Sequence, residues 1–370
     1  MKESVLVPID KQIKAAYLFI VIHTMQIGVG LAGFPRIIYM EAKQDSWFVL
    51  LLAAILLHIV IFTIVYILNS FKNEDLQGIL QNLFGKWIGK IINTIFILYF
   101  LSMFLSVFVN YVEFVQVFIF PDLAPWFIGT LLIVLVVYAV HGGLRVAVGT
   151  SIIFFFITIW MVFLLIKPIT MMEFDHFYPI LTTTPEEWLR GVKATSFSVI
   201  GFEILWIIYP FISDKHHVQR YSQTAAIFTI TLLMYVTVVS IGYFSGTQLE
   251  EKIWPVLTLF KILSMSFFER FDILLVALWM FIILPNIILL AWMVTYSINR
   301  MTKCKDDYVL IALAIIALIT TIFLDERYYV NEFTDLVAQL GIYLGFIFPI
   351  ALLPIVWIHK KRNNRHAKNS

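Results

Sequence analysis

The sequence predicts an all-α integral membrane protein with ten transmembrane helices, arranged as a five-plus-five inverted repeat in which spans 1 and 6 are broken. Three observations support this fold class. First, 61% of the 370 residues are hydrophobic and only 14% are charged, whereas a soluble chain carries roughly 25% charged residues and cannot hide so much apolar surface. Second, the apolar residues gather in ten segments of helical length. Third, glycine interrupts two of these segments, and the two occupy matching places in the two halves.

The ten segments can be compared with the roughly 20 apolar residues that a helix needs to cross a bilayer. Six are long enough alone: 47–68, 91–112, 146–166, 222–244, 273–298 and 336–358. Segments 126–140 and 308–324 need flanking residues, and the interrupted segments are 13–40 and 193–212. We therefore expect one transmembrane domain over residues 1–370, with repeat one at about 11–168 and repeat two at about 190–360.

Lys and Arg are unevenly divided among the connections between the spans. If the N-terminus is inside, the inner connections carry the larger share, including Lys2 and Lys11 near the start and the basic tail 359–370. Positively charged connections favour the cytoplasmic side, so we expect both ends in the cytoplasm. The long outer connections, 167–190 and 246–272, contain proline and aromatic residues, which favours a packed cap over a cavity.

The first interruption contains Gly28, Gly30 and Gly33, followed by Pro35. Each glycine weakens a helix by roughly 1 kcal/mol, and proline suits the first turn of a new helix because its missing N–H has no partner there. We expect unwinding near 28–33. The alternative is close helix packing through small residues.

The sixth span carries Gly201 and the carboxylate of Glu203. A charged side chain inside the bilayer is costly and by default indicates function, so we expect unwinding near 199–203. The alternative is a structural Glu203 that accepts hydrogen bonds from backbone amides freed by the break.

Two interruptions at corresponding places in two halves are the best sequence indication of a binding site at the membrane midplane. The outer half of span 1 would present free amides near 33–35 and the positive end of a helix dipole, which suit a carboxylate. The outer half of span 6 would present free carbonyls near 199–201, which suit an ammonium group. A site with both poles fits a zwitterion, so a free amino acid is the expected ligand.

The candidate ligand-binding residues lie on spans 1, 3, 6 and 8. Asn110 shares a helix face with Glu113 near the outer end of span 3, where a solvated helix end is the alternative. Pro285 frees a carbonyl in span 8, and Asn286 follows it. The full set is Thr24, Ile27, Gly28, Val29, Gly30, Gly33, Asn110, Phe197, Val199, Ile200, Gly201, Phe202, Glu203, Pro285 and Asn286.

Several classes of function are excluded. The single cysteine, Cys304, permits no intramolecular disulfide and no Cys-x-x-Cys metal cluster, and we expect no metal or cofactor. The basic residues are scattered among loops, so nucleic acid is not an expected partner. The sequence has no P-loop, no His-Glu-x-x-His motif and no nucleophile motif, and we do not expect an enzyme.

At the two interruptions the chain resembles the amino acid–polyamine–organocation superfamily, whose members have the inverted-repeat fold of bacterial leucine transporters. It is more closely similar to the B subunits of endospore germinant receptors, from about Lys11 to Arg362. The segments that carry this resemblance are 85–89 (GKWIG), 253–255 (IWP), 259–260 (LF) and 268–271 (FERF).

The resemblance implies a nutrient-sensing receptor subunit in the spore inner membrane, surrounded by lipid and working with an A subunit and a lipoprotein C subunit. This chain departs from related transporters, because span 5 (146–166) has no lysine and the middle of span 8 has no Ser/Thr pair. Ion coupling at those places is therefore in doubt. A secondary amino-acid permease, proton-coupled through Glu113 or Glu203, is the other interpretation.

Overall fold

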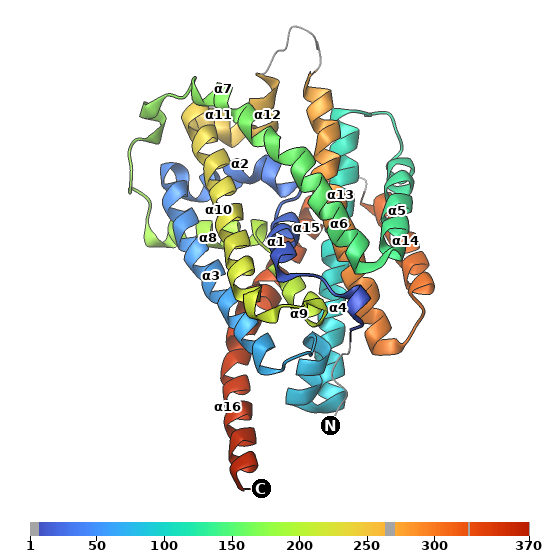
Figure 1. Cartoon of the computed structure of the whole chain (residues 1–370). Coiled ribbons are helices and arrows are strands. Elements are labelled where there is room, and N and C mark those ends of the chain that lie inside the picture. The colour runs from blue at the N-terminus through green and yellow to red at the C-terminus, as the bar shows by residue number, and fades with distance from the viewer. Residues whose placement is uncertain (1–6, 263–270, 325, 370) are drawn as a thin grey trace.

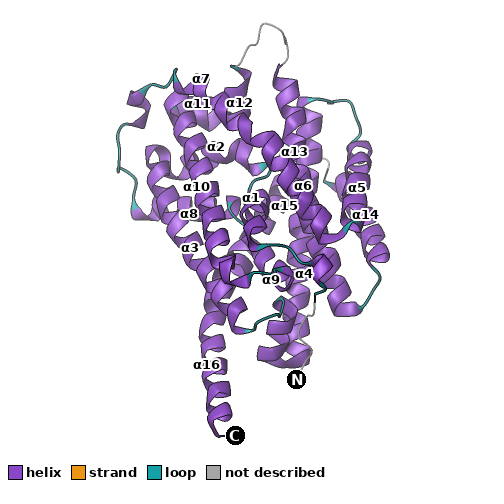
Figure 2. Cartoon of the chain, in the orientation of Figure 1, coloured by secondary structure: helices purple, strands orange, loops and turns teal. Residues whose placement is uncertain are grey.

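The computed structural model describes residues 7–262, 271–324 and 326–369, and these residues form a bundle of helices (Figures 1 and 2). The only contact of β type in this part of the chain is an isolated parallel bridge between Ile13 and Ile212. Lys2 and the FER portion (268–270) of the FERF motif, both used in the sequence analysis, lie outside the described residues.

The first half of the chain forms helices α1 to α7. Their bounds are α1 Leu18–Gln26, α2 Gly30–Ala42, α3 Ser46–Ser70, α4 Leu76–Phe118, α5 Pro125–His141, α6 Gly143–Thr158 and α7 Ile166–Ile169, with the 3₁₀ helix η4 (Ile159–Leu165) between α6 and α7. Inside α4, Gly85 has a φ of 79°, a left-handed conformation that glycine adopts without penalty. The kink at Gly85 separates the first turns of α4 from its long apolar part.

The second half forms helices α8 to α16. Their bounds are α8 Pro185–Ser198, α9 Leu205–Ile208, α10 Val218–Tyr243, α11 Gly246–Glu251, α12 Pro255–Lys261, α13 Phe271–Thr302, α14 Asp306–Phe323, α15 Arg327–Gly341 and α16 Phe348–Asn369. Two short 3₁₀ helices, η6 (Phe202–Ile204) and η7 (Tyr209–Phe211), flank α9, and the π-helix η9 (Ile342–Ile347) joins α15 to α16. In Figure 1, α16 and the turn between α3 and α4 lie at one end of the bundle, and α7, α11 and α12 lie at the opposite end.

Among the described residues, seven helices are long and apolar enough to cross a membrane, or eight if the bent pair Pro185–Ser198 and Phe202–Phe211 is one span. Two further apolar helices, Ala15–Gln26 and Pro125–His141, are shorter. The chain is therefore an integral membrane protein of helical type. Of the seven long apolar helices, α13 is the most buried. It packs against α4 and α6, while α10 packs against α1 and α3, and α2 against α8.

The helical segment that was expected to begin near 33–35 begins earlier. The N–H groups of Leu31 and Ala32 donate to the carbonyls of Gly28 and Val29 at 3.3 and 3.1 Å, so the first turn of α2 is already closed there. Gly33 and Pro35 consequently lie inside α2. The interruption is limited to residues 27–29, and the free helix end is at Gly30.

The segment before α1 is joined to the segment after η7. Ile13 N donates to Phe211 O at 2.8 Å, and Ser213 N donates to Ile13 O at 3.0 Å. The Asp214 carboxylate accepts from the Ala15 amide at 2.7 Å. Burial raises the pKa of Asp214, but the hydrogen bonds from Ala15 and Ser213 and the nearby His217 outweigh it, so this pKa is lower than usual.

Candidate functional site

The end of α1 is held by a side chain from α13. In a continuous helix the carbonyls of Thr24 and Met25 would accept from the amides of residues 28 and 29, but the chain leaves the helix at Ile27. Instead, Asn286 Nδ2 donates to both carbonyl oxygens at 3.1 Å. The amide of Asn286 thus satisfies the acceptors that the end of α1 leaves open.

The interruption between α8 and η6 is held by Glu203. Gly201, with φ of 121°, turns the chain, and its N–H donates to Glu203 Oε2. Tyr99 of α4 donates its hydroxyl to Glu203 Oε1 at 2.9 Å. Glu203 is buried, and each of its oxygens has a donor. This arrangement matches the alternative in which Glu203 accepts from an amide freed at the break.

The two interruptions touch each other. A Cβ placed on Gly201 would lie 2.5 Å from the carbonyl oxygen of Met25, so only a residue without a side chain fits there. Gln26 Nε2 donates to Val199 O across the contact at 2.9 Å. Residues separated by 173 positions in the sequence are therefore joined at one point.

Opposite backbone groups remain free at this point. Within the described part of the chain, the N–H groups of Gly28, Val29 and Gly30 have no hydrogen-bond acceptor, and the carbonyls of Phe197, Ser198 and Ile200 have no donor. Gly30 is exposed, and the other five residues are half-buried. No atom lies within 4 Å of a Cβ placed on Gly30. Free amides at the start of α2 favour an anion and free carbonyls at the end of α8 favour a cation.

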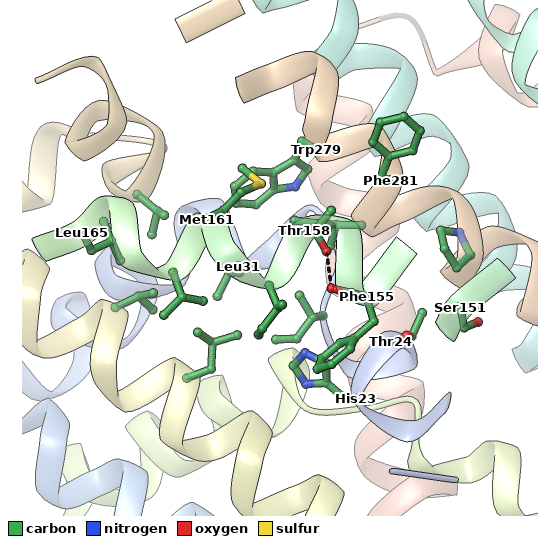
Figure 3. A pocket seen from close by; sticks show the side chains of 18 of the residues that line it. His23, Thr24, Leu31, Ser151, Phe155, Thr158, Met161, Leu165, Trp279 and Phe281 are labelled. Carbon is green, nitrogen blue, oxygen red and sulfur yellow. Dashed lines mark hydrogen bonds between the residues drawn. The ribbon is translucent and has the colours of Figure 1, made fainter. Parts of the chain in front are cut away.

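A cavity of about 70 Å³ lies beside α1 (Figure 3). Of the predicted residues, Thr24, Ile27 and Pro285 line it, and none from span 6 does. Its wall comes from α1, α2, α6, η4, α10, α12 and α13, and consists of His23, Thr24, Ile27, Leu31, Ser151, Phe155, Thr158, Ile159, Met161, Val162, Leu165, Leu232, Val236, Val256, Phe260, Trp279, Phe281, Ile282 and Pro285. In Figure 3 Thr24 and Ser151 lie toward the right of the cavity and Thr158 lies near its middle, and most of the wall is apolar.

Some predicted residues contact other parts of the bundle. Asn110 Nδ2 donates to Thr334 Oγ1 of α15 at 2.7 Å. Phe202 packs edge-on against Phe346, and Gly33 packs against the carbonyl of Ile253. At these three positions the predicted residues contact other residues of the chain.

Three residues outside the predicted set contribute to this region. Gln26 joins the two interruptions, Tyr99 holds Glu203, and His23 lines the cavity. His23 Nδ1 is also 2.9 Å from Thr229 Oγ1 of α10. The sequence signal for Gln26 was its polarity and its place two positions before Gly28. Its partner, Val199, is distant in sequence, so the contact could not be read from the sequence.

Ion pairs close the α11 end of the bundle above the interruptions. Glu113 Oε1 and Arg327 Nη1 are 2.6 Å apart, and the Arg327 guanidinium lies 4.5 Å from the centre of the Trp254 ring. Lys43 Nζ and Glu250 Oε1 are also 2.6 Å apart. Glu113 therefore has a partner within the chain and is not a solvated helix end. No group of His, Cys, Asp and Glu able to hold a metal ion occurs among residues 7–262, 271–324 and 326–369.

These features define an integral membrane protein with a transporter fold. The structure of MhsT in complex with L-phenylalanine matches with a TM-score of 0.67 at 12% identity, over 98% of this chain and 93% of that one. A Na⁺-coupled sialic acid symporter matches with a TM-score of 0.61 at 12% identity, over 94% of this chain and 78% of that one.

The chain belongs to the spore germination protein family, whose model matches residues 12–330. It is 33% identical to spore germination protein GerQB of Bacillus cereus over 95% of this chain and 96% of the relative. It is 23% identical to spore germination protein A2 of Bacillus subtilis (strain 168) over 60% of each.

Proposed function

We propose that this chain is the transporter-like, nutrient-sensing B subunit of a spore germination receptor, and that it binds a free amino acid between the α1–α2 and α8–η6 interruptions. The observation that carries the proposal is the contact between the two interruptions, where the amides of 28–30 and the carbonyls of Phe197, Ser198 and Ile200 are free. The free amides suit a carboxylate, and the free carbonyls suit an ammonium group. Paired helix ends of this kind bind substrate in transporters with broken helices.

The proposed topology has ten spans in a single domain, with the first and sixth broken and both ends inside. The seven long helices and the bent pair reach ten spans with two shorter apolar helices. Ala15–Gln26 joins α2 across the first interruption, and Pro125–His141 is a span of its own, extended by flanking residues. The proposed repeats remain those at about 11–168 and 190–360. The placement of α16 and the α3–α4 turn at one end of the bundle (Figure 1) supports this orientation.

In this proposal the ligand contacts divide by role. The backbone at Gly28, Val29 and Gly30 binds the carboxylate. Phe197 and Ile200 supply carbonyls for the ammonium group. The other predicted residues of span 6, namely Val199, Gly201, Phe202 and Glu203, hold the interruption in shape.

The cavity beside Ile27 takes the ligand's side chain. Its volume of about 70 Å³ is under half of the about 150 Å³ cavity that holds benzene. Its wall is mostly apolar. A short aliphatic side chain fits this space better than an aromatic ring.

The proposed setting is the spore inner membrane, with an A subunit and a lipoprotein C subunit as partners. Membership of the spore germination family and the likeness to GerQB support this assignment. The exposed apolar side chains of α6 and η4, such as Phe156 and Phe163, suit contact with membrane lipid.

A secondary amino-acid permease is the second candidate. A cavity of about 620 Å³ opens at the α16 end and is lined by polar groups that include Arg145 of α6 and Thr295 and Asn299 of α13. The same two helices line the cavity at the interruptions, so the two spaces lie along shared elements. Proton coupling would involve Glu113 or Glu203, which already have Arg327 and Tyr99 as partners.

A binding experiment with the purified full-length chain in lipid nanodiscs tests the proposal. L-Alanine, L-valine and L-leucine are compared with their N-acetyl and methyl-ester forms. Each blocked form loses a charge-assisted contact worth about 1.5–3 kcal/mol, so affinity should fall about tenfold to a hundredfold. Equal binding of free and N-acetyl forms would contradict the zwitterion site.

A second measurement separates the two candidates. Uptake of the bound amino acid into proteoliposomes, with and without a proton gradient, reports transport. Germination of a strain that lacks this chain reports sensing. Binding and germination without uptake support the receptor, whereas gradient-driven uptake with normal germination of the deletion strain supports the permease.

A further inference from the structure

Two buried amide side chains stand at the contact between the interruptions, and each is only half satisfied. Gln26 is 5% exposed and Asn286 is 3% exposed. Their amide nitrogens donate to the carbonyls of Val199, Thr24 and Met25. Among the described residues, however, Gln26 Oε1 and Asn286 Oδ1 are buried with no hydrogen-bond partner.

The orientation of both amides follows from their neighbours. Amide oxygen and nitrogen are normally assigned from the hydrogen-bond network. Here the neighbours are backbone carbonyl oxygens, which accept only from N–H. Turning either amide over would place two oxygens against each other, so the unpartnered atom is an oxygen at both positions.

An unpartnered buried acceptor is unfavourable, and native structures rarely leave one without a reason. Both side chains lie beside the backbone groups of the proposed site. A Cβ on Gly28 would be 3.7 Å from Asn286 Nδ2, and Gln26 directly precedes the Ile27 that lines the cavity. The two side chains therefore adjoin the free amides expected to bind the carboxylate, as the two charged groups of an α-amino acid adjoin each other.

We infer that Gln26 and Asn286 recognise the ligand's ammonium group through Gln26 Oε1 and Asn286 Oδ1. This inference rests on the proposed amino-acid function; it adds Gln26 to the predicted site and gives the predicted residue Asn286 a role in specificity. An ammonium group has three N–H donors, enough for both oxygens and for one of the carbonyls of Phe197 and Ile200. Hydrogen bonds from a charged donor are stronger than those between neutral groups. An α-hydroxy acid of the same shape has a hydroxyl in place of the ammonium group, with a single donor and no positive charge, so it leaves at least one of the two oxygens unpaired.

The test compares each amino acid with the α-hydroxy acid of the same side chain. Purified full-length chain is titrated with L-alanine and L-lactate, and with L-leucine and L-2-hydroxyisocaproate. Wild type should prefer the amino acid by about tenfold to a hundredfold. In Gln26→Met and in Asn286→Leu the preference should fall to a few-fold.

The ratio of the two affinities separates recognition from structure. If the two side chains only hold the backbone, losing the hydrogen bond to Val199 or Thr24 weakens binding of the amino acid and of the hydroxy acid equally. The ratio of the two affinities then stays unchanged. The matched control is Gln77→Met, which removes a buried glutamine that donates to the Arg300 carbonyl at 3.4 Å; its ratio should equal that of wild type.

Three sets of results decide between the inference, the proposed function and a purely structural role for the two amides. An unchanged ratio in both Gln26→Met and Asn286→Leu overturns the inference and leaves the amino-acid site standing. Failure of wild type to bind any of the four compounds overturns the proposed function and the inference with it. If the apolar variants do not fold, Gln26→Glu and Asn286→Asp keep the acceptor and drop the donor; a retained preference supports the inference, and a lost one overturns it.

Discussion

Replacing Gly201 by alanine tests the contact between the two interruptions most directly. Gly201 has a φ of 121°, and an added Cβ would lie 2.5 Å from the Met25 carbonyl oxygen and 2.7 Å from its carbon. The backbone conformation costs a non-glycine residue about 1–3 kcal/mol. Forcing a methyl group against backbone that cannot turn aside costs about 1–3 kcal/mol more. We therefore expect Gly201→Ala to lower the free energy of unfolding by about 2–6 kcal/mol.

Thermal unfolding of the purified protein in detergent, followed by tryptophan fluorescence, measures this loss. Gly149→Ala is the matched control, because Gly149 lies in α6 with no atom within 4 Å of an added Cβ and alanine favours a helix over glycine. The control should unfold at or slightly above the wild-type midpoint. A Gly201→Ala protein with the wild-type midpoint would refute the contact between the interruptions.

Three further predictions concern the helix ends and the N-terminal segment. Gly30→Val has open space, so it should keep the wild-type unfolding midpoint but lose amino-acid binding in the nanodisc titration; normal binding would count against the site. Glu203→Gln should unfold close to wild type, because an amide can accept from the Gly201 N–H and donate to the Tyr99 oxygen, whereas Glu203→Leu should lose about 2–5 kcal/mol; equal midpoints for the two variants would refute the structural role. The lowered pKa of Asp214 stabilises the fold above the unfolded value of about 3.9, and this contribution disappears as the pH falls through the folded pKa. Wild type should therefore exceed Asp214→Asn in unfolding midpoint at pH 6, and the gap should close below about pH 4; a gap independent of pH would contradict this.

The helical membrane character of the chain follows from composition, and the structure agrees with it because a chain with 61% hydrophobic residues has few alternatives to a helical membrane bundle. The ten-span, five-plus-five arrangement stays a prediction. The local start of α2 was harder to predict. Pro35 suggested a helix beginning near it, yet hydrogen bonds from Leu31 and Ala32 close a turn earlier. Sequence patterns locate helix ends only to within a few residues, since capping contacts decide the final turn.

The part of the site that escaped prediction depends on contacts between distant segments. Gln26 is an ordinary polar residue until Val199 O is placed 2.9 Å from its amide. The position of the cavity on the α6 and α10 side of α1 also depends on how the helices pack. No periodicity within one segment contains that information. Glu203 was conspicuous because a single carboxylate in an apolar span is rare, but its donors, Tyr99 and Gly201, required the structure.

The hydrogen bonds around the two interruptions provide a physical route from binding to signalling. Asn286 joins α13 to α1, Gln26 joins α1 to the end of α8, and Tyr99 joins α4 to Glu203. A ligand shifts a conformational equilibrium only to the extent that it binds the two states with different affinity. A ligand whose ammonium group is held by amides of α1 and α13 requires both helices to keep their present relation, so any state in which α13 moves relative to α1 loses contacts and affinity. Binding would therefore hold α1, α4, α8, α13 and η6 in one arrangement. A receptor passes that arrangement on to partner subunits, whereas a permease must afterwards break it to release the ligand. The receptor and the permease would therefore share a site and differ in the free energy needed to leave the bound state.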